Sequence, residues 1–239
     1  MEKIFKIFVD FDGTISKQDI GESIFRRFGD KEKVENIITK LLSDEITAKQ
    51  CWQSLCNSVE KLDKNELNEF IDSIEIDHTF HKLVNYSKKN EMDLFVISDG
   101  FNYYIDRVFE REKLSGIKYY SNKLEFDSNN KLVPTFPYLD QNCTTSANCK
   151  RNHIINHSGE DEYTIFIGDG NSDKYTVQFC DFIFAKDDLL KYCEVERITY
   201  FPFNNFNDVI EKIDELKSRR RLKKRYQAEL KRREIYINE

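Results

Sequence analysis

The sequence predicts an α/β fold in which a Rossmann-like parallel sheet forms the core and a helical-bundle cap domain is inserted after the first strand. Three observations lead to this prediction. Short apolar runs rich in Ile, Val and Phe recur and end in polar turns, as buried strands do. Helical periodicity separates most of these runs, which is typical of parallel βαβ units. Between the first two runs, residues 16–86 carry only helical signals.

The individual elements follow from these patterns. Apolar residues spaced three and four apart, interrupted by polar breaks, predict about four helices within the insert. Two strand-like runs around an Asp/Asn-rich turn predict a hairpin from residues 117–126 and 131–136. Further helices are expected around Val108, from Lys150 and around Val177. The other strands are expected at residues 4–9, 92–97, 163–167, 182–185 and 197–201.

Length and composition set the domain organisation. The 239 residues, 39% of them hydrophobic, suffice for a core with a smaller insert. We expect residues 1–15 and 87–216 to form the α/β core, 16–86 the cap, and 217–239 a basic C-terminal helical tail. No apolar window is long enough for a membrane span, and the N-terminus leaves no room for a signal peptide. A cytoplasmic protein with six reduced thiols is therefore expected, and Cys143 with Cys149 lacks the second ligand pair of a zinc site.

Charge is distributed unevenly along the chain. The net charge is −6, but the stretch from Lys217 to Arg233 is strongly basic, so the remainder is markedly acidic. An acidic body argues against nucleic acid as the substrate. Leu222, Tyr226 and Leu230 are four apart, which predicts a tail helix with a narrow apolar seam. A solvated helix extension is the favoured interpretation, and a docking element for an acidic partner, an anionic membrane surface or a nucleic acid is the alternative.

The most informative segment is Val9-Asp10-Phe11-Asp12-Gly13-Thr14, at the end of the first strand. Side chains two apart on extended backbone share a face, so Asp10 and Asp12 point the same way. Two adjacent carboxylates are costly unless a cation or a shared proton lies between them. Gly13 permits close backbone approach, and the Thr14 hydroxyl can bind an anion or cap the turn. This arrangement suits metal-assisted attack on phosphorus, although the hexapeptide alone is also compatible with a plain polar turn.

The later strands also end in polar residues. The second is followed by Ser98-Asp99-Gly100, and the third long run by a loop that contains Asp169 and Asp173. Lys150 opens a helix, where the helix dipole disfavours a cation, which favours a functional role. The ends of parallel strands meet at one edge of a sheet, so these residues are expected to converge there.

Histidine pairs offer weaker candidates. The pair His153 and His157, four apart, could bind a metal, but surface helix positions are favoured for it and for His78 and His81.

Taken together, the motifs DFDGT, ISDG, Lys150 and GDGNSD resemble, in order, those of the haloacid dehalogenase (HAD) superfamily of phosphohydrolases. The resemblance spans the chain to about Phe203. The helical insert is similar to the cap of the phosphoserine phosphatase-like branch. Within that branch, the segments SDGFNYYI and DFIFAKDDLLKYC, and the CK pair ahead of a helix, resemble the group of 2-hydroxy-3-keto-5-methylthiopentenyl-1-phosphate phosphatases of methionine salvage.

The resemblance implies a role for each motif residue. Asp10 is expected to be the nucleophile that forms an aspartyl-phosphate, and Asp12 the general acid and then the general base. Lys150 is expected to stabilise the charge on the transferring group. The resemblance also implies Mg²⁺, held by the Asp10 side chain, the Asp12 backbone carbonyl and Asp169, while Asp173 orients the metal shell or the lysine.

The phosphate and cap contacts are also implied. Thr14, Ser98 and the backbone N–H groups of Asp99 and Gly100 are expected to hold the substrate phosphate. Asp19 lies where related enzymes place a cap carboxylate that can meet substrate, and it can equally serve as a helix N-cap.

The expected function is therefore Mg²⁺-dependent hydrolysis of a small phosphorylated metabolite. Ser172 stands where phosphoserine phosphatases usually carry Asn, which weakens phosphoserine as the substrate. Two alternatives remain: a binding or scaffold protein that acts through the basic tail, and transfer of phosphate to an acceptor other than water. The sequence makes no prediction of oligomeric state.

Overall fold

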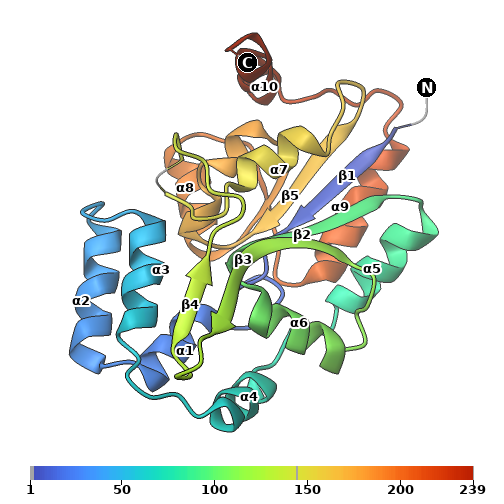
Figure 1. The fold of residues 1–239 in the computed structure, drawn as a ribbon. Helices are drawn as coiled ribbons and strands as arrows, with labels where there is room; N and C mark the ends of the chain where they lie inside the picture. Colours follow the sequence, from blue (N-terminus) through green and yellow to red (C-terminus); the bar gives the residue numbers. More distant parts are fainter. Residues whose placement is uncertain (1–2, 144, 239) are drawn as a thin grey trace. The chain divides into compact units, whose positions relative to one another are not determined.

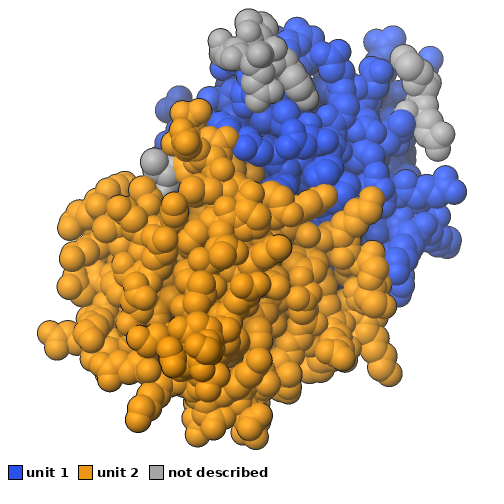
Figure 2. All heavy atoms as spheres, viewed as in Figure 1, with its two compact units in different colours: residues 1–15, 76–97, 150–239 blue, residues 16–75, 98–149 orange. Residues whose placement is uncertain are grey.

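The computed structural model describes residues 3–143 and 145–238, so the first two residues and the last residue of the expected tail lie outside it. By their internal contacts the residues form two compact units (Figure 2). The first unit comprises residues 1–15, 76–97 and 150–239, and the second comprises 16–75 and 98–149. Strand β2 (Asp93–Phe101) passes from the first unit into the second after Ile97. Among the described residues, no helix combines the length and apolar character needed to cross a bilayer.

The first unit is built on a parallel sheet (Figure 1). Strand β1 (Phe5–Val9) lies between the first half of β2 and β5 (Tyr163–Gly168), and β6 (Phe182–Ala185) and β7 (Phe201–Pro202) follow in that order. Val9, the last residue of β1, is paired with Val96 of β2 on one side and with Ile167 of β5 on the other. The carboxyl end of β1 therefore lies level with these residues of its two neighbouring strands. Their inner residues are buried Ile, Val and Phe, as expected for strands covered on both faces. The predicted α/β fold with a parallel sheet is confirmed.

Helices of the first unit cover this sheet. The helices α5 (Phe80–Lys89) and α9 (Phe206–Ser218) pack together, with the rings of Phe80 and Phe206 5.2 Å apart. The helices α7 (Lys150–Asn156) and α8 (Asp187–Val195) precede β5 and β7 in the chain. Two short 3₁₀ helices, η1 (Asn171–Asp173) and η2 (Thr176–Phe179), connect β5 to β6, where the sequence predicted one helix around Val177.

The second unit contains the helices of the predicted insert. Its first four helices are α1 (Ile20–Phe28), α2 (Lys31–Leu42), α3 (Ala48–Asn57) and α4 (Lys64–Ser73), which confirms the expected number. A polar side chain caps the N-terminus of each, because the first N–H groups of a helix have no internal partner. The unit also contains α6 (Asn102–Arg111) and the predicted hairpin, formed by β3 (Lys118–Phe126) and β4 (Leu132–Thr135).

Polar contacts explain why residues 98–149 group with these helices. From α6, the Tyr103 hydroxyl donates to Asn68 Oδ1 at 2.7 Å, and Arg107 forms an ion pair with Asp72 of α4. Arg111 donates to three main-chain carbonyls at the end of α4. The compact units therefore divide the chain at other positions than the predicted core and cap, whose boundaries stay a prediction.

The last strand is shorter and later than expected. A strand was predicted at residues 197–201, whereas β7 comprises only Phe201 and Pro202. Arg197 adopts a left-handed conformation with φ of +55°, and the Ile198 N–H bonds to the Cys193 carbonyl at 2.8 Å. These contacts close the C-terminus of α8, so residues 196–198 complete a helix end and cannot join the sheet.

The basic tail differs most from its prediction. Helix α10 (Tyr226–Asn238) begins only at Tyr226, and Leu222 lies in the preceding coil, where its carbonyl accepts a hydrogen bond from the Tyr163 hydroxyl at 2.8 Å. The tail is not a solvated extension, because Arg232 is 9% exposed. Its guanidinium donates to Asp181 Oδ1 at 3.0 Å, to Thr164 Oγ1 at 3.1 Å and to the Phe179 carbonyl. The tail is thus part of the first unit.

Removing the Arg232 cation should unfold the protein more easily. Arg232→Met leaves the buried Asp181 carboxylate without its cation, which is expected to cost about 3–5 kcal/mol of unfolding free energy. Urea denaturation measures this loss. Arg233→Met is the matched control, because Arg233 is 61% exposed and forms its ion pair with Glu229 on the same helix, so a change within about 0.5 kcal/mol is expected. Equal effects of the two substitutions would contradict a docked tail.

The helix α7 buries a histidine that was predicted to lie on the surface. His153 is buried, while His157 is half-buried and stacks on the Phe95 ring at 4.8 Å. Burial, with a smaller contribution from His157, lowers the pKa of His153 to about 4. The surface interpretation is therefore wrong for His153, because α7 turns this side toward the sheet.

This burial predicts a loss of stability in mild acid. The unfolded chain takes up the proton near pH 6.5, whereas the folded protein resists it down to about pH 4. Stability is therefore complete above pH 6.5 and falls toward pH 4, by roughly 3 kcal/mol for this group. In His153→Leu, urea denaturation across this range should show a correspondingly flatter pH dependence. His78→Leu, at an exposed site, is the matched control, and a slope unchanged by His153→Leu would contradict the assignment.

Candidate active site

The first part of the site lies at the end of β1. The Asp10 N–H continues the sheet by donating to the Ile167 carbonyl at 2.9 Å, and its own carboxylate accepts from the Phe11 N–H at 2.8 Å. Phe11 is fully buried, Asp10 is buried and Asp12 is half-buried. The alternation predicted from the sequence therefore sends the aromatic ring into the core.

Two further carboxylates join Asp10 in the first unit. Asp169 follows β5, and Asp173 lies in η1. The three side chains each offer an oxygen, and these oxygens lie within 4.8 Å of one another. Three residues far apart in the sequence thus form one acidic cluster, because β1 and β5 are neighbours in register.

Lys150 supplies the cation of this cluster. Its ammonium donates to Asp10 Oδ1 and Asp173 Oδ1, both at 2.6 Å, and to Ser172 Oγ at 3.1 Å. Its side chain is 1% exposed. Burial alone lowers the pKa of Lys150, but the carboxylates of Asp10 and Asp173 outweigh it, so the pKa is raised and the lysine stays charged.

The cluster carries more negative than positive charge. Burial and the neighbouring Asp173 carboxylate raise the pKa of Asp10, although Lys150 opposes the shift. The same two causes, burial first, raise the pKa of Asp169 to about 7. Three carboxylates surround one ammonium, so the electrostatics favour a further cation of two positive charges at this position.

Gly13 and Thr14 shape the turn next to Asp169. Gly13 has φ of +76°, and a Cβ atom there would lie 2.2 Å from Asp169 Oδ2. The position therefore requires glycine for both its conformation and its space. The Thr14 hydroxyl donates to Asp169 Oδ1 at 2.5 Å, so it holds a carboxylate of the cluster in place.

Asp173 is held on both of its oxygens. Oδ1 accepts from Lys150 at 2.6 Å, and Oδ2 accepts from the N–H groups of Asp169 and Gly170, each at 3.2 Å. Gly168 leaves room for this carboxylate, since a Cβ atom there would lie 2.4 Å from Asp173 Oδ2. These contacts suit a residue that orients its neighbours.

Ser98, Asp99 and Gly100 belong to the second unit. Ser98 is fully buried, and its Oγ accepts from the Gly100 N–H at 2.9 Å. Asp99 Oδ1 accepts from Ser146 Oγ at 2.8 Å and from the N–H groups of Ala147 and Asn148 at 2.7 Å. The Asp99 side chain therefore holds the loop that leads, two residues later, to Lys150.

The structure adds two residues that the sequence did not single out. Asn148 donates from Nδ2 to the Ser98 carbonyl at 2.7 Å, and the Trp52 Nε1–H points to Asp99 Oδ2 at 3.4 Å. Trp52 lies in α3 and Asn148 in the loop before α7, where no local pattern marks either residue as functional. Asp19, by contrast, is exposed and caps α1 through the Glu22 N–H at 2.7 Å, which confirms its predicted N-cap role.

Comparison with known proteins gives this chain a class, that of the phosphatases. The family model described as Putative Phosphatase matches residues 5–196. The chain belongs to this family, and it is a phosphoric monoester hydrolase. The resemblance inferred from the motifs is confirmed, and none of the similarities supports the scaffold alternative.

Curated relatives share most of their length with this chain. It is 30% identical over 213 residues to the 2-hydroxy-3-keto-5-methylthiopentenyl-1-phosphate phosphatase of Bacillus mycoides (strain KBAB4), covering 88% of this chain and 96% of the relative. It is 29% identical over 211 residues to the protein of the same name from Bacillus cereus (strain ATCC 10987 / NRS 248), covering 85% and 93%.

Solved structures support the fold. A phosphoserine phosphatase carrying a phospho-aspartyl intermediate analogue superposes with a TM-score of 0.68 at 18% identity, covering 89% of this chain and 99% of that chain. A substrate-bound phosphoserine phosphatase superposes with a TM-score of 0.67 at 19% identity, again over 89% and 99%.

Proposed function

We propose that this protein is a Mg²⁺-dependent, cytoplasmic phosphatase that hydrolyses a small phosphorylated metabolite through an aspartyl-phosphate on Asp10. One observation carries the proposal. Lys150 donates to the buried Asp10 and Asp173 within a cluster of three carboxylates completed by the half-buried Asp169, which leaves that cluster short of positive charge.

The donor set fits Mg²⁺. Carboxylate and carbonyl oxygens are the ligands this ion prefers, and it commonly takes only one or two carboxylates from the protein. Asp10, Asp169 and the Asp12 backbone carbonyl would hold it, while Asp173, with donors on both oxygens, orients Lys150 and the loop. When bound, the ion supplies charge that offsets the repulsion between a carboxylate nucleophile and the phosphate.

The chain's own residues account for the two chemical steps. The Asp10 carboxylate attacks phosphorus, an O–P bond forms to Asp10, and the bond to the leaving oxygen breaks. Asp12 gives its proton to that oxygen. Water then attacks phosphorus, Asp12 takes back a proton, and inorganic phosphate leaves Asp10. Lys150 stabilises the negative charge of the transferring group, and Ser98 with the following N–H groups holds phosphate oxygens.

The substrate proposal draws on the relatives. Their name describes hydrolysis of a 2-hydroxy-3-keto-5-methylthiopentenyl 1-phosphate, and we propose a substrate of that type for this chain. Ser172, which accepts from the Lys150 ammonium at 3.1 Å, stands where phosphoserine phosphatases usually carry Asn, so phosphoserine is the less favoured substrate.

Metal binding and substrate choice can be tested separately. Mg²⁺ should raise the melting temperature of the wild-type protein, and this shift should shrink in Asp169→Asn, because one ligand charge is lost. Ca²⁺, which also takes oxygen ligands, is the control for selectivity. Catalytic efficiency across a panel of phosphate monoesters then ranks the substrates. A melting temperature insensitive to Mg²⁺, or turnover that persists in a chelator, would contradict the metal assignment.

A further inference from the structure

The basic tail divides its cations between two sides. On the inner side, Lys224 donates to the Glu160 carbonyl, Arg225 to the Val177 carbonyl, and Arg232 to Asp181. These cations hold the tail on the first unit. The tail therefore presents a surface of defined structure, where a solvated extension would offer only a mobile charge.

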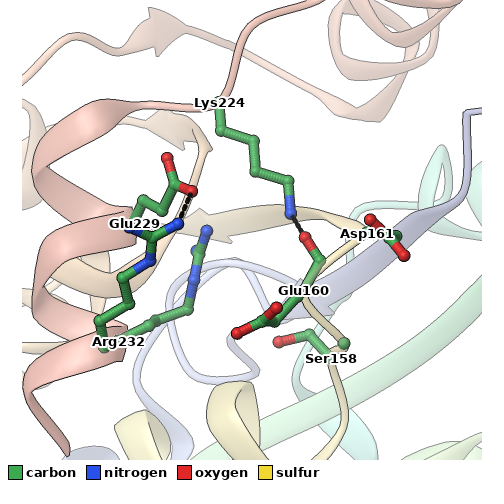
Figure 3. A pocket seen from close by; sticks show the side chains of 8 residues that line it. Ser158, Glu160, Asp161, Lys224, Glu229 and Arg232 are labelled. Carbon is green, nitrogen blue, oxygen red and sulfur yellow. Dashed lines mark hydrogen bonds and ion pairs between the residues drawn. The ribbon is translucent and has the colours of Figure 1, made fainter. Parts of the chain in front are cut away.

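A pocket lies between the tail and the loop of residues 158–161, and its lining contains both acidic and basic side chains. Figure 3 shows it between α10 and the loop of residues 158–161, with the carboxylates of Glu160 and Asp161 across from the Arg232 guanidinium. It has a volume of about 200 Å³. Because carboxylates line one wall, this inner side does not favour an anion.

The outer side of the coil is different. Arg220, Arg221 and Lys223 are exposed, and within the described part of the chain none of them forms an ion pair or a side-chain hydrogen bond. They fall within four residues of one another, and the carbonyl of Leu222 between them is held by the Tyr163 hydroxyl. Three uncompensated cations are thus fixed close together and face solvent.

The adjoining helix face adds apolar surface. Tyr226 is 70% exposed and Leu230 39% exposed, and their spacing of four places them on one face of α10. The opposite face carries Ala228 and Arg232, which are buried against the first unit. The exposed aromatic and aliphatic side chains therefore follow directly on the exposed cations.

We propose that this outer surface, formed by Arg220, Arg221, Lys223, Tyr226 and Leu230, binds the headgroup region of an anionic lipid bilayer. Clustered Lys and Arg are attracted to anionic headgroups, while Tyr and Leu insert at the boundary between water and lipid. Leu230 favours a bilayer over a nucleic acid, because bases stack on aromatic rings but gain little from an exposed aliphatic side chain.

The net charge of the rest of the chain also favours a partner that contacts only the outer surface of the tail. Residues 217–233 hold ten basic side chains and one acidic side chain, a net charge of +9, which leaves −15 on the rest of the chain. A bilayer needs to meet only the outer surface of the tail, whereas a long nucleic acid would be repelled by the rest. The surface also lies beyond residue 196, where the family match ends, so it is separate from the shared activity.

Vesicle co-sedimentation of the full-length protein tests the proposal. At about 0.1 M salt we expect binding to phosphatidylcholine vesicles that contain phosphatidylserine, and none to vesicles of phosphatidylcholine alone. Arg220→Gln/Arg221→Gln/Lys223→Gln should weaken this binding on the order of a hundredfold. Tyr226→Ala/Leu230→Ala should weaken it several-fold. Hydrolysis of p-nitrophenyl phosphate in solution should be unchanged in both variants.

A matched control separates this surface from general charge. Lys31→Gln/Lys33→Gln/Lys40→Gln removes the same charge from exposed positions of α2 and should retain wild-type vesicle binding. Equal binding to both kinds of vesicle, or equal loss in the control, would overturn the proposal. Single-stranded RNA bound more tightly than the anionic vesicles, and unaffected by Tyr226→Ala/Leu230→Ala, would also overturn it in favour of a nucleic-acid partner.

Discussion

Asp10→Asn should abolish hydrolysis of p-nitrophenyl phosphate, lowering kcat by on the order of 10⁴- to 10⁶-fold. The amide cannot act as the attacking oxygen, so no O–P bond to the enzyme forms. Its neighbours remain in place, because Asn keeps the volume of Asp and can still accept from Lys150. Steady-state kinetics with Mg²⁺ measures the effect.

The same substitution should stabilise the metal-free protein. Asp10 is one of three carboxylates clustered near a single ammonium, and its neutralisation removes like-charge repulsion from Asp169 and Asp173. We therefore expect a higher melting temperature in chelator and a smaller gain on adding Mg²⁺. A simple folding defect would lower both activity and melting temperature, so the two measurements together are decisive. Activity within tenfold of wild type would refute Asp10 as the nucleophile.

Lys150→Met should be the second most severe change, since it affects stability as well as rate. The apolar side chain leaves Asp10 and Asp173 without their shared cation, which is expected to cost about 3–5 kcal/mol of unfolding free energy. It also removes the charge that faces the transferring group, so kcat should fall by roughly 10²- to 10³-fold. Urea denaturation and steady-state kinetics measure the two effects.

A double-mutant cycle measures the interaction energy between Lys150 and Asp173. Asp173→Asn alone should also destabilise, because it weakens a carboxylate that bonds two N–H groups and Lys150. In Lys150→Met/Asp173→Asn the loss of unfolding free energy should be clearly smaller than the sum of the losses in the two single variants. The reason is that the second substitution removes a charge that the first left unpaired. Mg²⁺ should restore more stability to Lys150→Met than to wild type. Strict additivity would argue against a direct interaction.

Much of the fold could be predicted locally. Strand β6 was predicted at the residues where it is found, and the four helices of the insert followed from apolar spacing and capping residues such as Asp19. Strand β7 and the start of α10 were predicted incorrectly, because helix closure at Arg197 and the Tyr163–Leu222 hydrogen bond override the local pattern.

Several residues of the site were accessible from the motifs, but their partners were not. Nothing in the order of residues shows that Thr14 holds Asp169, or that Asp99 binds the loop of residues 146–148. These contacts join segments between 47 and 155 positions apart in the chain. They depend on how strands pair and helices pack.

The amino-acid order alone therefore determined the class of chemistry, because carboxylates and glycines recur where apolar runs end, and Lys150 opens a helix between them. The three-dimensional arrangement decided which charges share a partner: Lys150 with Asp10 and Asp173, and Arg232 with Asp181. The physical reason is that a charge removed from water must find its counter-charge, and only the packed chain determines which groups lose their water.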